Sequence, residues 1–238
     1  MGLSKMEKFK EVWYACYGSN LKNQRFDRYI SGGTAENSSM SAAGSTDKRP
    51  IADRQPFVTH WELHFGRKCA GWQDMAVAFL SRAKSAASPP SAQQAITSGA
   101  LCRLYRISFD QFVDVFLQEN GGNPFDSENR STVKSSIVDA MVDLGHDESK
   151  VINNGIPEDR WYRRLVRLGT VDQLPVVTFT SHIDFEFGEP SNFYLQTIVS
   201  GLFESGHSDV SREQLVEYLT RTAKKDPEEV RRLVDSQE

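Results

Sequence analysis

The sequence predicts an α+β fold built around one large core. Short apolar runs typical of strands are interrupted by amphipathic segments typical of helices, without the regular spacing of βαβ units. No segment of the sequence repeats. With 238 residues, 39% of them hydrophobic, the chain is long enough for one large domain or for one domain with appendages.

Composition excludes several classes of partner. The formal net charge is −4 and the basic residues form no stripe, which argues against nucleic acid and against an anionic membrane surface. No window approaches 18 uninterrupted apolar residues, and the charged N-terminus does not resemble a signal peptide. The three cysteines lack the spacing of a disulfide framework or a zinc site. We therefore expect a soluble cytoplasmic protein without a metal.

The first apolar run, Val12 to Tyr17, stops abruptly at Gly18-Ser19-Asn20. This pattern predicts a buried strand that enters a tight turn, because Gly and Asn tolerate conformations that other residues avoid. Successive N–H groups in such a turn can bind a carboxylate or another small anion. By spacing alone, the same pattern is also typical of an ordinary loop entry.

The first half of the chain then predicts a short helix, three strands and two connectors. The helix is expected at Lys22 to Ile30, a long polar loop at 34–56, strands at Phe57 to Phe65, Met75 to Leu80 and Gly99 to Ile107, and a flexible connector at 84–95.

The clearest helix follows Ser108, which forms a capping-box pair with Gln111. Its apolar residues have helical spacing, and Glu119 projects at the edge of the apolar stripe whereas Asp114 points further away. Partial burial and the C-terminal end of the helix dipole would both raise the pKa of Glu119 toward values suited to proton transfer. The alternative is a solvated glutamate at a fraying helix end.

The second half is polar and punctuated by Gly, Pro and Asn over 123–163, with one helix expected near Val133 to Leu144. Strands are expected at Leu165 to Val171 and at Val176 to Thr180. Three further helices are expected to begin at the capping residues Ser191, Ser211 and Asp226.

Three blocks in this order resemble the γ-glutamylcyclotransferase-like family. The first is Tyr17-Gly18-Ser19-Asn20-Leu21, the loop that holds the γ-glutamyl end of the substrate in that family. The second is Glu119, although one residue separates it from Gly121, where the family has Glu-Gly. The third is Pro190-Ser191-Asn192-Phe193-Tyr194, followed by Ile198 and Gly201.

The resemblance implies a mixed β-barrel with surrounding helices. It covers 1–206, with polar insertions at 34–56 and 123–163, and leaves 207–238 as a C-terminal helical extension. It also implies cyclisation of a γ-glutamyl amide to 5-oxoproline without a cofactor, as in glutathione metabolism. Glu119 would be the general acid/base, and substrate would be bound by Tyr17, Gly18, Ser19, Asn20, Leu21 and Tyr194. Glutathione, γ-glutamyl amino acids and γ-glutamyl amines share the recognised end, and the oligomeric state stays open.

Two other functions remain open: a non-catalytic binding or regulatory module on the same fold, and an amide hydrolase that releases glutamate. Glu186 and Glu189 are the alternatives to Glu119 as the acid/base. A metal pair at His60 and His64 and a nucleophilic role for Cys16 are disfavoured, since neither has the required partners. The arginines at 163, 164 and 167 are expected to form a solvated face.

Overall fold

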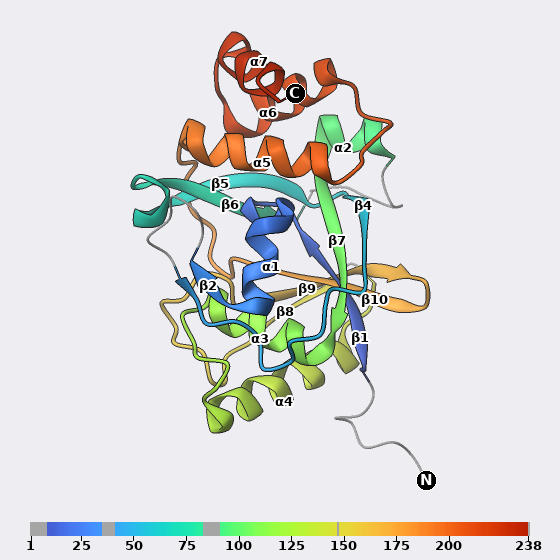
Figure 1. Ribbon diagram of the computed structural model, residues 1–238, viewed down its shortest axis with the longest axis vertical. Helices are drawn as coiled ribbons and strands as arrows, with labels where there is room; N and C mark the ends of the chain where they lie inside the picture. Colours follow the sequence, from blue (N-terminus) through green and yellow to red (C-terminus); the bar gives the residue numbers. More distant parts are fainter. Residues whose placement is uncertain (1–8, 35–40, 83–90, 147, 238) are drawn as a thin grey trace. The chain divides into compact units, whose positions relative to one another are not determined.

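The computed structural model describes residues 9–34, 41–82, 91–146 and 148–237 (Figure 1). The chain forms two compact units, which we describe separately. Unit 1 comprises Met1–Ala15, Phe26–Arg54 and Leu104–Ile183, and unit 2 comprises Cys16–Arg25, Gln55–Arg103 and Asp184–Glu238. The predicted boundary after residue 206 falls within unit 2, whose last two helices belong to the predicted extension.

The described residues form a mixed α+β fold with seven helices and a six-stranded sheet of order β4-β7-β1-β10-β9-β8. In this sheet β1 and β10 are parallel, whereas β10 and β9 are antiparallel, as are β9 and β8. The α+β class is confirmed. The strand order runs in a row from β4 to β8, so the expected closed barrel stays a prediction.

The strands are β1 Glu11–Cys16, β2 Gly33–Thr34, β3 Ser41–Ala42, β4 Asp53–Thr59, β5 Glu62–Cys69, β6 Met75–Ser81, β7 Ala100–Ser108, β8 Glu148–Val151, β9 Arg164–Val171 and β10 Leu174–Thr180. The helices are α1 Asn23–Ser31, α2 Ala92–Ser98, α3 Phe109–Glu119, α4 Ser127–Asp143, α5 Asn192–Glu204, α6 Arg212–Ala223 and α7 Pro227–Asp235. Short 3-10 turns lie at Ser19–Leu21 and Ala70–Trp72.

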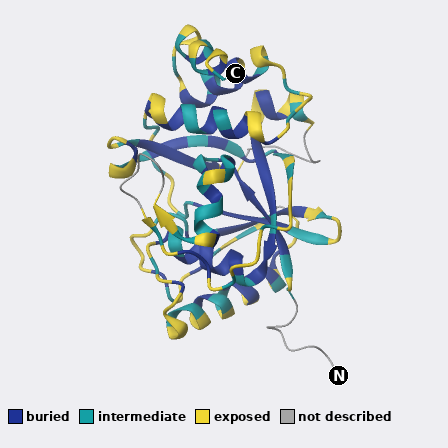
Figure 2. Cartoon of the chain, in the orientation of Figure 1, coloured by how far each residue is buried: buried dark blue, intermediate teal, exposed yellow. Residues whose placement is uncertain are grey.

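Aromatic stacking fills the core of unit 1. The ring centroids of Tyr14 and Phe179 lie 5.3 Å apart, and those of Phe26 and Tyr105 lie 4.1 Å apart. Phe112 reaches the same cluster from α3, with its centroid 5.9 Å from that of Tyr14. All five side chains are buried, and Figure 2 shows that buried residues, in dark blue, fill long stretches of the strands and helices. This burial confirms the apolar stripe predicted for α3.

Local capping chemistry sets the helix starts as predicted. Ser108 and Gln111 form a capping box at α3, and Ser211 with Gln214 forms another at α6. Ser191 caps α5 by accepting a hydrogen bond from the backbone N–H of Tyr194 at 3.1 Å. Each cap satisfies a backbone donor that the helix itself cannot satisfy.

Two predicted elements of the first half are wrong. The single strand from Phe57 to Phe65 is two strands, because β4 ends at Thr59 and β5 begins at Glu62. Thr59 Oγ1 accepts the N–H of Trp61 at 3.2 Å, which closes a turn within the apolar alternation. The expected loop at 34–56 includes β3 and the start of β4, and its residues 35–40 lie outside the described residues, as do residues 84–90 of the other connector.

The second half contains a longer helix than predicted. Helix α4 begins at Ser127, six residues before the expected start, and Asp126 caps it by accepting the N–H of Asn129 at 3.1 Å. The predicted solvated face of three arginines is also wrong at Arg163. This residue is only 4% exposed, and it donates to the backbone carbonyls of Ile152 and Glu158. These contacts link β9 to the segment that precedes it.

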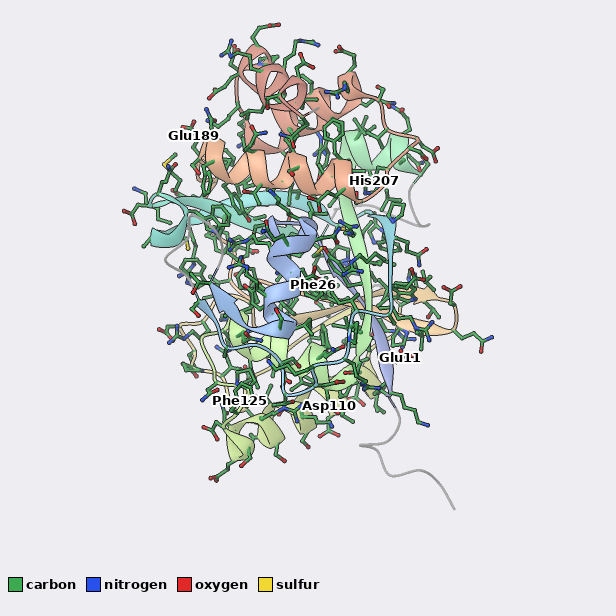
Figure 3. All side chains as sticks on the ribbon, in the orientation of Figure 1. Glu11, Phe26, Asp110, Phe125, Glu189 and His207 are labelled. Atoms are coloured by element: carbon green, nitrogen blue, oxygen red, sulfur yellow. The ribbon has the colours of Figure 1, made fainter. Side chains whose placement is uncertain are left out.

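Asp114 corrects the helical-wheel interpretation, because its side chain is fully buried. Its Oδ2 accepts hydrogen bonds from Ser45 Oγ, Thr46 N and Thr46 Oγ1, each at 2.7 Å. Its Oδ1 accepts from Arg130 Nε at 2.6 Å, and Arg130 also pairs with the half-exposed Asp110, which is labelled in Figure 3. This face of α3 is therefore covered by polar groups that satisfy the buried charge.

We predict that Asp114→Ala destabilises the protein by about 3–5 kcal/mol, because Arg130 and the Ser45–Thr46 donors lose their buried acceptor. Chemical denaturation measures the change. The control is Asp143→Ala, which removes an exposed ion pair with Lys150 and should cost less than about 1 kcal/mol. Equal effects of the two substitutions would contradict a structural role for the buried network.

Candidate functional site

The loop after β1 forms a tight 3-10 turn, as predicted. Strand β1 ends at Cys16, and the N–H of Leu21 donates to the carbonyl of Gly18 at 3.0 Å. The N–H of Lys22 donates to the carbonyl of Ser19 at 3.3 Å, after which α1 begins. Asn20 and Leu21 are buried, whereas Gly18 and Ser19 are partly exposed.

Tyr194 lies directly against this loop in unit 2. Its Oη accepts the N–H of Ala78 at 3.1 Å, and this hydrogen bond holds the position of the hydroxyl. A Cβ added at Gly18 would lie 2.9 Å from that Oη. The Tyr194 ring also packs at 4.5 Å from the ring of Trp72. The structure thus brings together two of the three blocks that the sequence singled out.

A buried arginine, Arg103, binds the backbone of this loop. Arg103 is 5% exposed, and its Nη1 donates to the carbonyl of Leu21 at 3.1 Å. The same Nη1 lies 3.6 Å from Glu204, which accepts the N–H of Asn23 at 2.9 Å. Sequence analysis did not identify Arg103 or Glu204, since no local pattern links either of them to the loop.

Glu119 is the last residue of α3 and is half-buried. Its neighbours hold this helix end in unit 1. Gln118 donates to the carbonyl of Tyr29 at 3.0 Å and accepts the N–H of Gly44 at 3.0 Å. Asn120 and Tyr162 exchange two hydrogen bonds of 3.2 Å each. Because Glu119 and the loop lie in different units, its participation in the site stays a prediction.

The alternative carboxylates lie in unit 2 and are exposed. Glu189 forms an ion pair with Lys225 at 2.6 Å, and it is labelled in Figure 3. Glu186 is exposed two residues before Gly188. The ion pair with Lys225 already engages the Glu189 carboxylate, and neither carboxylate is buried.

Burial makes the thiols poor nucleophiles. Desolvation raises the pKa of Cys16 well above its usual value, and it also raises the pKa of Cys102. Desolvation lowers the pKa of His207, whose Nε2 lies 2.9 Å from the carbonyl oxygen of Cys102. His64 Nε2 lies 3.2 Å from the carbonyl oxygen of Phe185, with its pKa likewise lowered by burial. Burial therefore disfavours the charged forms of all four groups.

The described residues contain no group of three or more His, Cys, Asp and Glu side chains arranged to hold a metal ion. In the same part of the chain, no helix combines the length and the apolar character needed to cross a bilayer.

No family model matches the chain. The sequence is 33% identical to histone deacetylase 5 of Arabidopsis thaliana over 231 residues. The match covers 90% of this chain and 31% of that protein, so the chain spans about a third of the length of the curated relative that it matches.

Two solved structures are similar to this chain at low identity. An uncharacterized human protein shares 15% identity at a TM-score of 0.47, and a gamma-glutamyl cyclotransferase shares 14% identity at a TM-score of 0.42. Each similarity covers 95% of this chain and 99% of the other. At these values neither similarity carries weight in the assignment of function.

We predict that Gly18→Ala destabilises the protein less in a Tyr194→Phe background than in the wild-type protein. The new methyl group meets Tyr194 Oη first, and Tyr194→Phe removes that atom. A double-mutant cycle by chemical denaturation should give a coupling of about 1 kcal/mol.

The control for this cycle is Tyr218→Phe. Tyr218 is also buried and also accepts a backbone N–H, that of Leu101 at 3.2 Å, but no contact links it to Gly18. Gly18→Ala and Tyr218→Phe should therefore be additive. Additivity with Tyr194→Phe as well would mean that the hydroxyl does not contact the loop.

Proposed function

We propose that this chain is an enzyme of the γ-glutamylcyclotransferase kind. It would cyclise a γ-glutamyl amide to 5-oxoproline and release the attached amine or amino acid, without an organic cofactor or a metal. The proposal extends to the mixed β-barrel, to the division of the chain at 1–206 and 207–238, and to a cytoplasmic location.

One observation carries the proposal: the Tyr194 hydroxyl lies at Gly18, so two family-like blocks 176 positions apart meet in unit 2. In an ordinary loop entry, a tyrosine hydroxyl held beside the glycine has no purpose. In a substrate-binding loop it has one, because a fixed hydroxyl and a fixed backbone can together orient a small polar ligand.

The reaction moves two protons from the attacking nitrogen to the leaving nitrogen and consumes no external reactant. The α-ammonium group of the substrate loses one proton to the Glu119 carboxylate, and the freed nitrogen attacks the γ-carbonyl carbon of the same molecule. Glu119 passes this proton to the leaving nitrogen as the tetrahedral centre collapses and the bond to that nitrogen breaks. The new ring nitrogen then gives up its second proton, which the released amine takes up to become an ammonium group. Five-membered ring closure within one bound molecule has a high effective molarity.

Negative charge that develops on the γ-carbonyl oxygen needs N–H donors at the loop. The N–H groups of Leu21 and Lys22 are already engaged within the 3-10 turn. We therefore assign the stabilising contact to the earlier N–H groups, those of Gly18 and Ser19. The Tyr194 hydroxyl lies beside this part of the loop and accepts the N–H of Ala78.

A second candidate function is a non-catalytic binding or regulatory module on the same fold. It is favoured by the match to histone deacetylase 5, because the matched segment is only 31% of a protein whose name refers to another reaction. In this reading, the loop binds a γ-glutamyl compound or 5-oxoproline, and the rest of a longer protein responds to occupancy.

We predict that Glu119→Gln lowers 5-oxoproline formation by about 10²–10⁴-fold while the protein stays folded, because the amide cannot shuttle the proton. The measurement is mass detection of 5-oxoproline from a panel of γ-glutamyl compounds. Circular dichroism and thermal unfolding establish that the variant is folded.

The matched controls are Glu186→Gln and Glu189→Gln, both of which should retain turnover. Loss of activity in either one, with Glu119→Gln active, would move the acid/base role to that residue. Free glutamate in place of the lactam would identify a hydrolase. If no γ-glutamyl compound is turned over but 5-oxoproline raises the melting temperature, the chain is a binding module.

A further inference from the structure

Arg103 contacts the chain at both ends of the candidate loop. Where the loop begins, the backbone carbonyl oxygen of Arg103 accepts a hydrogen bond from Cys16 Sγ at 3.4 Å. Where the loop ends, Arg103 Nη1 donates to the carbonyl oxygen of Leu21 at 3.1 Å. All three residues belong to unit 2 and are buried. Through its backbone and its side chain, Arg103 therefore joins the two ends of the loop to strand β7.

The guanidinium of Arg103 is a buried charge. A guanidinium stays charged at every ordinary pH, so its removal from water is costly. Glu204 is an ion-pair partner, with its Oε2 3.6 Å from Arg103 Nη1, and the Glu204 side chain is 34% exposed. A buried charge with such a partner is weak evidence for a purely stabilising role. The contact with the loop is the feature that calls for an explanation.

The backbone of Leu21 passes the contact with Arg103 on to the front of the loop. The N–H of Leu21 donates to the carbonyl of Gly18 at 3.0 Å, while the carbonyl of Leu21 accepts from Arg103. In a planar trans peptide, the carbonyl and the N–H point in opposite directions. The bond to the Gly18 carbonyl therefore directs the N–H of Ser19, in the same peptide, away from the turn. Arg103 acts on this N–H through Leu21.

Glu204 fixes the chain on the other side of the same turn. Its Oε2 accepts the N–H of Asn23, the first residue of α1, at 2.9 Å. Arg103 and Glu204 thus bind the backbone on either side of Lys22. The N–H of Lys22 in turn donates to the carbonyl of Ser19 at 3.3 Å. The end of the turn is consequently held by β7 and by α5 at once.

We propose that Arg103 is a positioning residue, which acts through Leu21 to orient the N–H of Ser19 toward the reacting carbonyl oxygen. This inference rests on the proposed function, in which that N–H stabilises the negative charge that develops during ring closure. A donor whose direction is fixed in advance stabilises such charge without reorganisation. Because the charge is larger in the transition state than in the bound substrate, loss of this orientation lowers kcat more than it raises KM.

The test is the kinetic effect of Arg103→Met, which keeps a long apolar side chain but removes the donor and the charge. Steady-state formation of 5-oxoproline is measured with the most active of glutathione, γ-glutamylalanine and γ-glutamylethylamide. The value of kcat should fall about 10- to 100-fold, and KM should change by less than about 3-fold. Arg103→Lys keeps the charge and a donor, so it should recover part of kcat.

The matched control is Arg221→Met. Arg221 also belongs to unit 2, and its guanidinium donates to the backbone carbonyls of Ile96 and Ala95 at 2.8 and 3.2 Å, away from the loop. This substitution should lower the melting temperature and leave kcat unchanged. If Arg103→Met likewise lowers only the melting temperature, or raises KM alone, Arg103 has a structural or ground-state binding role and the proposal is overturned.

Amide hydrogen exchange tests the route through Leu21 without turnover. In Arg103→Met, the N–H of Leu21 should exchange faster relative to the rest of unit 2, whereas Arg221→Met should leave this relative rate unchanged. A lower kcat in Arg103→Met without faster exchange at Leu21 would mean that the arginine acts by another route, which also overturns the proposal.

Glu204→Ala is the second variant, and it decides the matter if Arg103→Met does not fold. It removes the acceptor of the Asn23 N–H and the ion-pair partner of Arg103 from a partly exposed position. It should lower kcat by about 3- to 10-fold with a smaller change in KM, and an unchanged kcat would overturn the proposal. Lactam from the wild type with unchanged kcat in the variants leaves the reaction standing. No lactam from the wild type with any of the three compounds would remove the proposed function, and the role of Arg103 with it.

Discussion

The close approach of α5 to the turn after β1 is the constraint on which the candidate site depends. A Cβ at Gly201 would lie 2.5 Å from the backbone carbon of Leu21 and from the nitrogen of Lys22, so no other residue fits there without a shift of the chain. Glycine inside a helix costs about 1 kcal/mol relative to alanine, and here it lets the helix touch the turn. Arg103 and Glu204 then hold the same turn by its carbonyl and by the N–H of Asn23.

Much of the fold could be predicted because its signals are local. Serine caps and apolar spacing lie within a few residues of the helix starts that they define, and the structure reproduces them at α3, α5 and α6. The turn between β4 and β5 was missed because Thr59 and Trp61 continue an apolar alternation without a Gly or Pro. The first six residues of α4 were missed because the partners that stabilise them, Asp110 and Asp114, belong to α3.

The residues of the candidate site also differ in whether a local sequence signal predicts them. The loop and Tyr194 could be found because each lies in a short, recognisable block, and the structure adds the contact between them. Asp114 and Arg103 could not be placed, since their burial and their neighbours depend on segments far away in the sequence. A helical wheel gives the direction of a side chain but not the identity of what covers it. For Arg103, the group that the side chain binds is a backbone carbonyl 82 positions earlier in the chain.

The reciprocal hydrogen bonds between Asn120 and Tyr162 join the two ends of a 41-residue excursion, 121–161, at one point beside Glu119. Lengthening a connection within this excursion costs little loop entropy, about 0.6 kcal/mol for each doubling of a flexible loop. Because Asn120 and Tyr162 hold the two ends together, such a change leaves those ends joined. Evolution could remodel this part of the surface while the end of α3 keeps its place.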